Sequence, residues 1–312
     1  MNKYLALCVL IGASTAYAGE EPLRAAVQTQ DAERFAALFL AGKVSAAELQ
    51  SGYLDGAGRG VQIFTPYRIQ NAANLAQQIS KRKGDYAHAV ATCLPVAESL
   101  NAELRAIYLA YRGLLPDLPL PRVYLVFGAG NSGGTAQPDA QVLGLEVLCK
   151  EGTTVPEFRA TMRRFFAHET VHTWQKPPSG AVRDRLLLSA LMEGVPDLLS
   201  ELVTGLEPDP VREAWARPRE AEIWLRFLED RLTMQSGDEK QSRAAFQRWF
   251  ANAGQRFENL PEGWPGELGY WVGRNVARAY FAKATDQREA LVRLISVRDP
   301  AEILQASGYA PR

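Results

Sequence analysis

Two histidines four residues apart in a long helical segment place the strongest constraint on this chain. Thr154 and Glu157 match the capping-box pattern that begins a helix, and Pro177 sets the latest point at which that helix ends. His168 and His172 lie within it, so their side chains share one helix face, with Cβ atoms about 5 to 6 Å apart. Both imidazoles can therefore bind a single metal ion.

Glu169, directly after the first histidine, gives this spacing a chemical meaning. Zinc in catalytic sites takes three protein ligands and keeps an open position for water. The carboxylate of Glu169 can reach that water and accept its proton. The pattern predicts one zinc ion per chain, with Glu169 as the general base.

A third ligand has to come from another segment. The extended motif with a third histidine fails, because Gln175 and Pro178 occupy the positions that it requires. Glu193 lies 21 residues beyond His172, on a second predicted helix that an antiparallel return would bring beside the first. Asp197, one turn further on, is expected to accept the other N–H of a liganding histidine.

Pro196 predicts a kink in this second helix. If the kink turned Glu193 away from the metal, Asp197 or Asp184 would be the substitute ligand. The sequence leaves that choice open.

Four segments of the chain resemble known proteins: GLEVL, AHETVHTWQ, EGVPD and LGYWVGRNVARAY. HExxH followed 21 residues later by Glu-x-x-x-Asp resembles the gluzincin metallopeptidases, of the thermolysin and aminopeptidase type. The succession of all four, over residues 119–309, is similar to a family of uncharacterised predicted zinc-dependent proteases. The resemblance implies zinc, a peptide or protein substrate, Glu169 as the base, and the ligands His168, His172 and Glu193.

The last of these segments contains the candidates for stabilising negative charge on a substrate oxygen. Such charge needs a fixed donor opposite the metal, and the metal helices offer none. Tyr270 is the first choice, and Arg274, one turn further on, is the second. The alternative is that Tyr270 packs in the core beside Trp271.

The N-terminus predicts export. Lys3 precedes an apolar run at residues 5–13, and Ala16-Tyr17-Ala18 has the small residues of a cleavage site. The run is about half of the roughly 20 residues that span a bilayer. We therefore expect residues 1–18 to be a cleaved signal peptide and the mature chain, periplasmic or secreted, to have no membrane span.

Export makes a disulfide between Cys93 and Cys149 the default state of the two remaining cysteines, with two buried free thiols as the alternative. Lys plus Arg and Asp plus Glu number 35 each, so no net charge attracts nucleic acid or an anionic membrane. Partner choice has to come from a local site.

The remaining pattern predicts a predominantly helical α+β protein. Residues 19–118 form an expected N-terminal helical region, which a proline cluster separates from a gluzincin-like zinc metallopeptidase domain at 119–312. Within that domain, residues 122–127 and 141–148 have the composition of two strands, forming a small sheet beside the metal helix. The glycines at 128, 130 and 133 formally match a dinucleotide-binding motif, but a second strand follows where that motif needs a helix, so we interpret them as a hairpin loop.

Together these patterns predict an exported zinc-dependent metallopeptidase. Two other functions stay open: a non-catalytic exported protein that holds a metal for structure, and a zinc hydrolase of a non-peptide amide. A structural zinc normally has four protein ligands, often including cysteine, whereas three candidates converge here. That difference favours an enzyme.

Overall fold

The computed structural model describes most of the chain, namely residues 19–152, 154–176, 182–235, 237–252 and 260–311. The predicted signal peptide, residues 1–18, and the expected turn at 177–180 lie outside the described residues. Among the described helices, none is long and apolar enough to cross a membrane.

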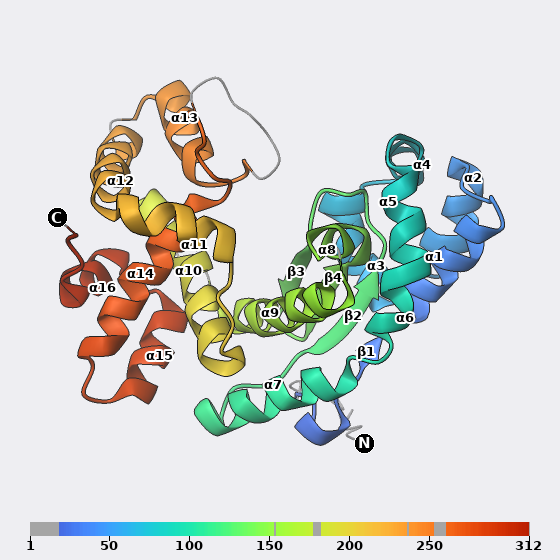
Figure 1. Cartoon of the computed structure of the whole chain (residues 1–312), viewed down its shortest axis with the longest axis horizontal. Coiled ribbons are helices and arrows are strands. Elements are labelled where there is room, and N and C mark those ends of the chain that lie inside the picture. The colour runs from blue at the N-terminus through green and yellow to red at the C-terminus, as the bar shows by residue number, and fades with distance from the viewer. Residues whose placement is uncertain (1–18, 153, 177–181, 236, 253–259, 312) are drawn as a thin grey trace, which may run out of the picture.

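A four-stranded sheet with the order β1-β2-β4-β3 lies at the centre of the fold (Figure 1). Its strands are β1 (Val27–Gln28), β2 (Arg122–Val126), β3 (Gly134–Gln137) and β4 (Ala140–Gly144). Strands β1, β2 and β4 are parallel, and β3 runs antiparallel to β4 at the edge. Every residue of β4 is buried, whereas β3 is partly exposed, so β3 is the strand that can face a ligand.

The helices of the N-terminal region lie on one side of the sheet, except for α7, which runs below the sheet toward α9 (Figure 1). They are α1 (Gln30–Leu40), α2 (Ala46–Leu49), α3 (Arg59–Phe64), α4 (Ala72–Lys81), α5 (Lys83–His88), α6 (Leu94–Ala97) and α7 (Asn101–Leu114). A 3-10 turn, η1 (Pro22–Arg24), precedes them, and three π-helical turns interrupt them: η2 (Gln50–Leu54), η3 (Thr65–Ile69) and η4 (Ala89–Cys93).

Nine further helices of the described residues, among them the 20-residue α9 and α10, follow the sheet in the C-terminal part of the chain. They are α8 (Leu145–Glu151), α9 (Val155–Trp174), α10 (Arg185–Thr204), α11 (Pro210–Ala216), α12 (Glu220–Gln235), α13 (Glu239–Trp249), α14 (Leu268–Lys283), α15 (Gln287–Ser296) and α16 (Pro300–Ser307), with a 3-10 turn η5 (Arg217–Arg219). Helix α9 lies between the sheet and the group α10 to α16 (Figure 1). The predicted fold class, a mainly helical α+β protein with a small sheet beside the HExxH helix, is confirmed.

Three local expectations about strands and helices are wrong. The N-terminal region is not all helical, because Val27–Gln28 pairs with β2.

The strand expected over 141–148 ends at Gly144, and α8 begins at the next residue. Almost all of this apolar run is buried, and hydrophobic periodicity cannot separate strand from helix in such a run. The expected loop between the strands contains β3, so β2 and β4 pair in parallel and do not form a hairpin. The boundary at residue 118 stays a prediction.

The helices that carry the predicted site begin as the sequence indicates. Thr154 and Glu157 form the capping box of α9, and the Asp184 side chain accepts a hydrogen bond at the start of α10. These caps satisfy amide groups that a helix start leaves without intrahelical partners. They fix where each helix starts and therefore which residues face each other.

Helices α10 and α14 touch through their backbones. A Cβ atom added to Gly194 would lie 2.1 Å from the amide nitrogen of Arg274, and one added to Gly273 would lie 1.7 Å from the carbonyl oxygen of Ala190. Only glycine fits at such distances, so this pair of residues permits the closest approach of the two helices. The contact fixes the position of residues near Gly194 relative to the first turns of α14.

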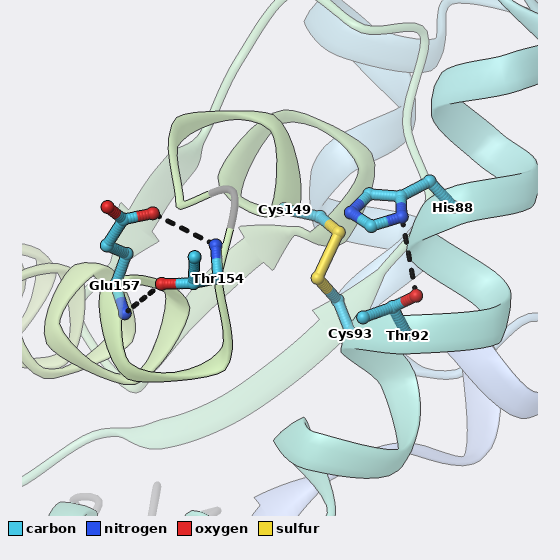
Figure 2. The surroundings of a disulfide bond; sticks show 6 residues. All are labelled: His88, Thr92, Cys93, Cys149, Thr154 and Glu157. Carbon is cyan, nitrogen blue, oxygen red and sulfur yellow. Dashed lines mark hydrogen bonds between the residues drawn. A yellow bond between two sulfur atoms is a disulfide. The ribbon is translucent and has the colours of Figure 1, made fainter.

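A disulfide joins the N-terminal helices to the segment after the sheet (Figure 2). Cys93, at the end of η4, bonds to Cys149 of α8 with an S–S distance of 2.09 Å. His88 lies beside the pair, and the three side chains are close enough to share an ion. Both sulfurs are bonded to each other, however, so this group has no thiolate to offer a metal.

Candidate metal site

Helices α9 and α10 bring the three predicted ligands together. The Nε2 atoms of His168 and His172 lie 3.0 Å apart, and Oε2 of Glu193 lies 3.5 and 3.2 Å from them, respectively. A tetrahedron with bonds of about 2.0 to 2.1 Å has edges of about 3.3 Å. The triangle formed by these donor atoms therefore has the size of one face of a zinc coordination tetrahedron.

The other ring nitrogen of His168 contacts Asp197, as the sequence indicates. Nδ1 lies 2.9 Å from Oδ1 of Asp197, whose side chain is 9% exposed. The carboxylate accepts a hydrogen bond from Nδ1–H, so Nε2 is the nitrogen that can lose its proton and bind a metal beside the other two ligand atoms. This contact selects the tautomer of His168 that can bind a metal.

His172 is oriented by a residue that sequence reasoning missed. Its Nδ1 donates to Oε1 of Gln175 at 2.7 Å, and Nε2 of Gln175 donates to the carbonyl of Met192 at 2.9 Å. That carbonyl would bond to the amide of residue 196 in a regular helix, but Pro196 has no N–H. Pro196 therefore frees the acceptor that holds Gln175, and helix α10 continues through it with Glu193 beside the histidines.

Burial and charge at this cluster favour a bound cation. Burial lowers the pKa of His168, but its hydrogen bonds to Asp197 and Glu193 outweigh that effect and raise the pKa to about 10. Burial raises the pKa of Glu193, but the two histidines outweigh it and hold this pKa far below its usual value. Oε2 of Glu193 is also buried without a hydrogen-bond donor of normal geometry. These residues fit a zinc ion, which would satisfy that oxygen and replace the protons.

Glu169 lies beside the three donor atoms and is not one of them. It is 6% exposed, and burial raises the pKa of its carboxyl group. Gly134 of β3 packs directly on it, since a Cβ added there would lie 2.3 Å from Oε1 of Glu169. The glycine lets the edge strand approach the carboxylate, which therefore stays at the wall of the site.

The site opens into a cleft with a volume of about 710 Å³. Residues of α9, α10 and α14 line it, together with Arg68 of η3, Ser132 and the segment from Gly134 to Pro138. Small-molecule sites typically measure about 300 to 1,000 Å³. The cleft therefore has the size for a small ligand at the candidate metal site.

Tyr270 lines this cleft. Its ring lies 6.0 Å from the His168 ring at an interplanar angle of 16°, and the guanidinium of Arg212 lies 5.4 Å from the tyrosine ring centroid. Burial raises the pKa of the phenol well above its usual value, and the nearby charge of Glu193 adds to this effect. The phenol therefore stays protonated and can donate a hydrogen bond.

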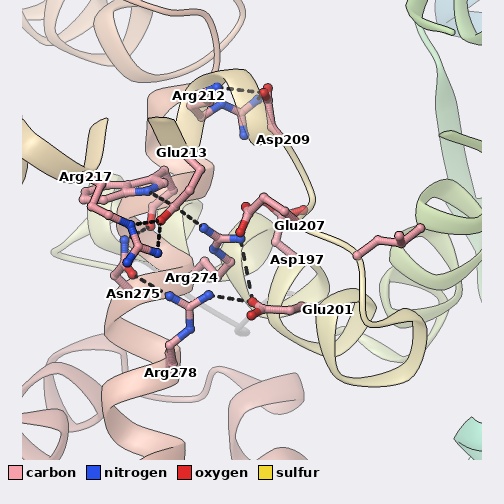
Figure 3. A network of polar contacts seen from close by, with 12 residues as sticks. Asp197, Glu201, Glu207, Asp209, Arg212, Glu213, Arg217, Arg274, Asn275 and Arg278 are labelled. Atoms are coloured by element: carbon pink, nitrogen blue, oxygen red, sulfur yellow. Dashed lines mark hydrogen bonds and ion pairs between the residues drawn. The ribbon is translucent and has the colours of Figure 1, made fainter. Parts of the chain in front are cut away.

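Arg274, the second choice for that role, lies elsewhere in the fold (Figure 3). It is 1% exposed, does not line the cleft and forms ion pairs with Glu207 and Glu213. Glu201 lies 3.7 Å away. The guanidinium links α10 and α11 to α14 and is not placed to contact a ligand. Asp184, considered above as a substitute ligand, pairs with Arg231 and caps α10.

Removing the Gln175 side chain tests the role of the hydrogen-bonded chain at His172. The variant Gln175→Leu is expected to lower zinc affinity about 10- to 100-fold, the usual effect of losing a partner of a metal-bound histidine. Competition with a chromophoric chelator measures this change. Gln137→Leu is the matched control, because Gln137 lines the same cleft but is exposed. Equal affinity of the two variants would contradict the assigned role of Gln175.

Comparison with known proteins identifies one similarity. Residues 187–311, about two fifths of the chain, match the family model described as Gliding motility protein GldB. No curated protein and no solved structure matches the chain. The match agrees with export to the cell envelope. It covers Glu193, Asp197 and Tyr270 but neither histidine of α9.

This match corrects the functional prediction made from the sequence. The chain resembles a gliding motility family over its C-terminal part, and the expected relation to gluzincins and predicted zinc-dependent proteases is contradicted, as is the metallopeptidase function. The physical reason is that two of the quoted motifs, AHETVHTWQ and EGVPD, describe two helices that present two imidazoles and a carboxylate to one point. That arrangement is compatible with a metal and an acidic neighbour, and it carries no information on a peptide substrate.

Proposed function

We propose that this chain is an exported zinc-binding protein of the cell envelope, with a metal centre suited to hydrolysis of a small non-peptide amide or ester. The observation that carries the proposal is the triangle formed by Nε2 of His168, Nε2 of His172 and Oε2 of Glu193. The similarity to gliding motility proteins supports a role at the envelope. An exported chain can be periplasmic or secreted, and we propose that this one is periplasmic.

The residues around the triangle support a hydrolytic role over a purely structural one. Three protein donors leave a coordination position open, whereas structural zinc sites are closed by four. Zinc bound here would supply the Lewis acidity that makes water nucleophilic near neutral pH. Glu169 can accept a proton from water in the cleft and pass it to a leaving group. The phenol of Tyr270, on the same cleft, can donate to a developing oxyanion.

Metal analysis of the purified mature protein tests the proposal. One zinc ion per chain is expected, and its removal by a chelator should abolish hydrolysis of a panel of non-peptide amides and esters. The variant Glu169→Gln should keep the zinc and lose the hydrolysis, because it removes a proton acceptor and not a ligand. Protein without zinc would contradict the proposal. Zinc-loaded protein that hydrolyses nothing in the panel would support the non-catalytic alternative.

A further inference from the structure

Arg68 lines the same cleft as the candidate metal ligands. It belongs to the π-helical turn η3, a kind of turn that is frequent at functional sites. Its carbonyl accepts a hydrogen bond from Nδ2 of Asn131 at 3.1 Å, and its Nε lies 3.5 Å from Oγ of Ser132, at the outer limit for a hydrogen bond. The loop before β3 therefore holds the backbone of Arg68 in place and leaves most of its guanidinium donors available.

The guanidinium of Arg68 forms no ion pair within 4.0 Å in the described part of the chain, although the side chain is half-buried. An acidic neighbour in the cleft is Glu169, where the charge of Arg68 offsets part of the rise in pKa that burial causes. Other arginines of the N-terminal region differ: Arg34 pairs with Asp31, Arg59 pairs with Asp139, and a third, at position 82, donates to two backbone carbonyls. A partly buried cation loses hydration, which an anionic partner would compensate. An anionic partner would therefore stabilise the charge of Arg68, and an anionic ligand can reach it through the cleft.

The charge of the cleft agrees with an anionic ligand once zinc is bound. Among the residues that line it, Glu169 and Glu193 contribute −2 and Arg68 contributes +1. A zinc ion adds +2, which gives a net charge of +1 with both histidines neutral. Zinc and Arg68 would then be two separate positive groups in one cleft of about 710 Å³.

We infer that Arg68 binds a carboxylate group of the substrate, so that the substrate class is a small amide or ester that also carries a carboxylate. The planar guanidinium matches a carboxylate through two parallel hydrogen bonds. A zinc ion held by His168, His172 and Glu193 would polarise the carbonyl of the amide or ester, while Arg68 would hold the carboxylate, so that the molecule is bound in one orientation. This inference rests on the proposed function, because it requires the metal.

Binding of paired hydroxamates to the zinc-loaded protein tests the inference without an activity assay. The probes are the monohydroxamates of succinic, glutaric and adipic acid, each compared with its methyl ester, which lacks only the charge. At the best spacer length, calorimetry is expected to show that the acid binds at least about 10-fold more tightly than its ester, the size of a charged hydrogen bond. In Arg68→Gln that ratio should fall to within about twofold, and in Arg68→Lys part of it should remain. Zinc content should stay at one per chain in both variants.

The variant Arg59→Gln is the matched control, because Arg59 is an arginine of the same N-terminal region that is already paired with Asp139 and does not line the cleft. It should keep the wild-type ratio. Equal binding of acid and ester by the zinc-loaded wild type, or an unchanged ratio in Arg68→Gln, would overturn this inference and leave the proposed function standing. A protein that takes up no zinc would overturn the proposed function and this inference with it.

Discussion

The variant Glu193→Ala is expected to bind zinc about 10³-fold more weakly than the wild type. Zinc sites in small proteins have binding free energies of about 10 to 16 kcal/mol, and losing one of three ligands removes roughly 4 kcal/mol of this. Oε2 of Glu193 is one corner of the triangle of ligand atoms, 3.5 and 3.2 Å from Nε2 of His168 and His172. In the described part of the chain, no other carboxylate belongs to this cluster of possible ligands. Competition with a chromophoric chelator at fixed pH measures the loss.

The control for this experiment is Glu98→Ala, an exposed glutamate outside the cleft, which should bind zinc as the wild type does. The circular dichroism spectrum of Glu193→Ala should match that of the wild type, because the caps of α10 remain. Undiminished zinc affinity would remove Glu193 from the ligand set. Asp197 would then be the next candidate, because Asp184 is held by Arg231.

Removing the disulfide is expected to lower the free energy of unfolding by about 4 kcal/mol. Cys93 and Cys149 are 56 residues apart in sequence, and a crosslink that closes a loop of this size restricts the unfolded chain by about that amount in the entropic account. Both residues are almost fully buried, so the variant Cys93→Ala/Cys149→Ala avoids placing new polar groups in the core. Urea denaturation measures the difference.

Reductant provides the internal control for the disulfide experiment. It should destabilise the wild type by an amount similar to the double substitution and leave the double variant unchanged. If reductant has no effect on the wild type, the two cysteines are not bonded in the exported protein. Zinc binding by the double variant, measured below its unfolding transition, should be retained, because neither cysteine lies in the metal cluster.

The metal cluster could be predicted because it depends on local rules. Helical periodicity places His168 and His172 on one face, and a capping box marks the start of their helix. Glu193 requires only that the next helix return alongside the first, which short connections between helices favour. Asp197 follows from the same helix face, one turn later.

The partners that orient the cluster from other segments could not be predicted in this way. Gln175 acts only because Pro196 leaves the Met192 carbonyl free, and that relation depends on how two helices meet in space. The sequence analysis used Pro196 only to predict a kink. Its second effect, a Met192 carbonyl without a partner in its own helix, is the signal that could have pointed to Gln175. Arg68 lies 100 residues before His168 and has no local pattern that distinguishes it from a surface arginine.

The prediction of the substrate failed for a related reason. Ligand spacing depends on the coordination chemistry of the ion, and the bond that is cleaved depends on the rest of the cleft lining. Part of that lining comes from η3 and the segment around β3, which the sequence indicated only as helix and loop. Arg274 was also a wrong candidate, because the sequence does not show which side of α14 faces the cleft. The side chain of Arg274 lies among acidic residues of α10, of α11 and of the connection between them.

The main-chain contact between Gly194 and Gly273 affects how a protein of this kind can evolve. Where two backbones touch, there is no side chain whose gradual replacement could shift one helix against the other. Glu193, beside the first glycine, and Tyr270, one turn from the second, are therefore inherited as a fixed unit. Variation that changes the preferred ligand without losing the ion has to accumulate among the cleft-lining residues of η3 and β3. Lineages that diverge in substrate should differ there first.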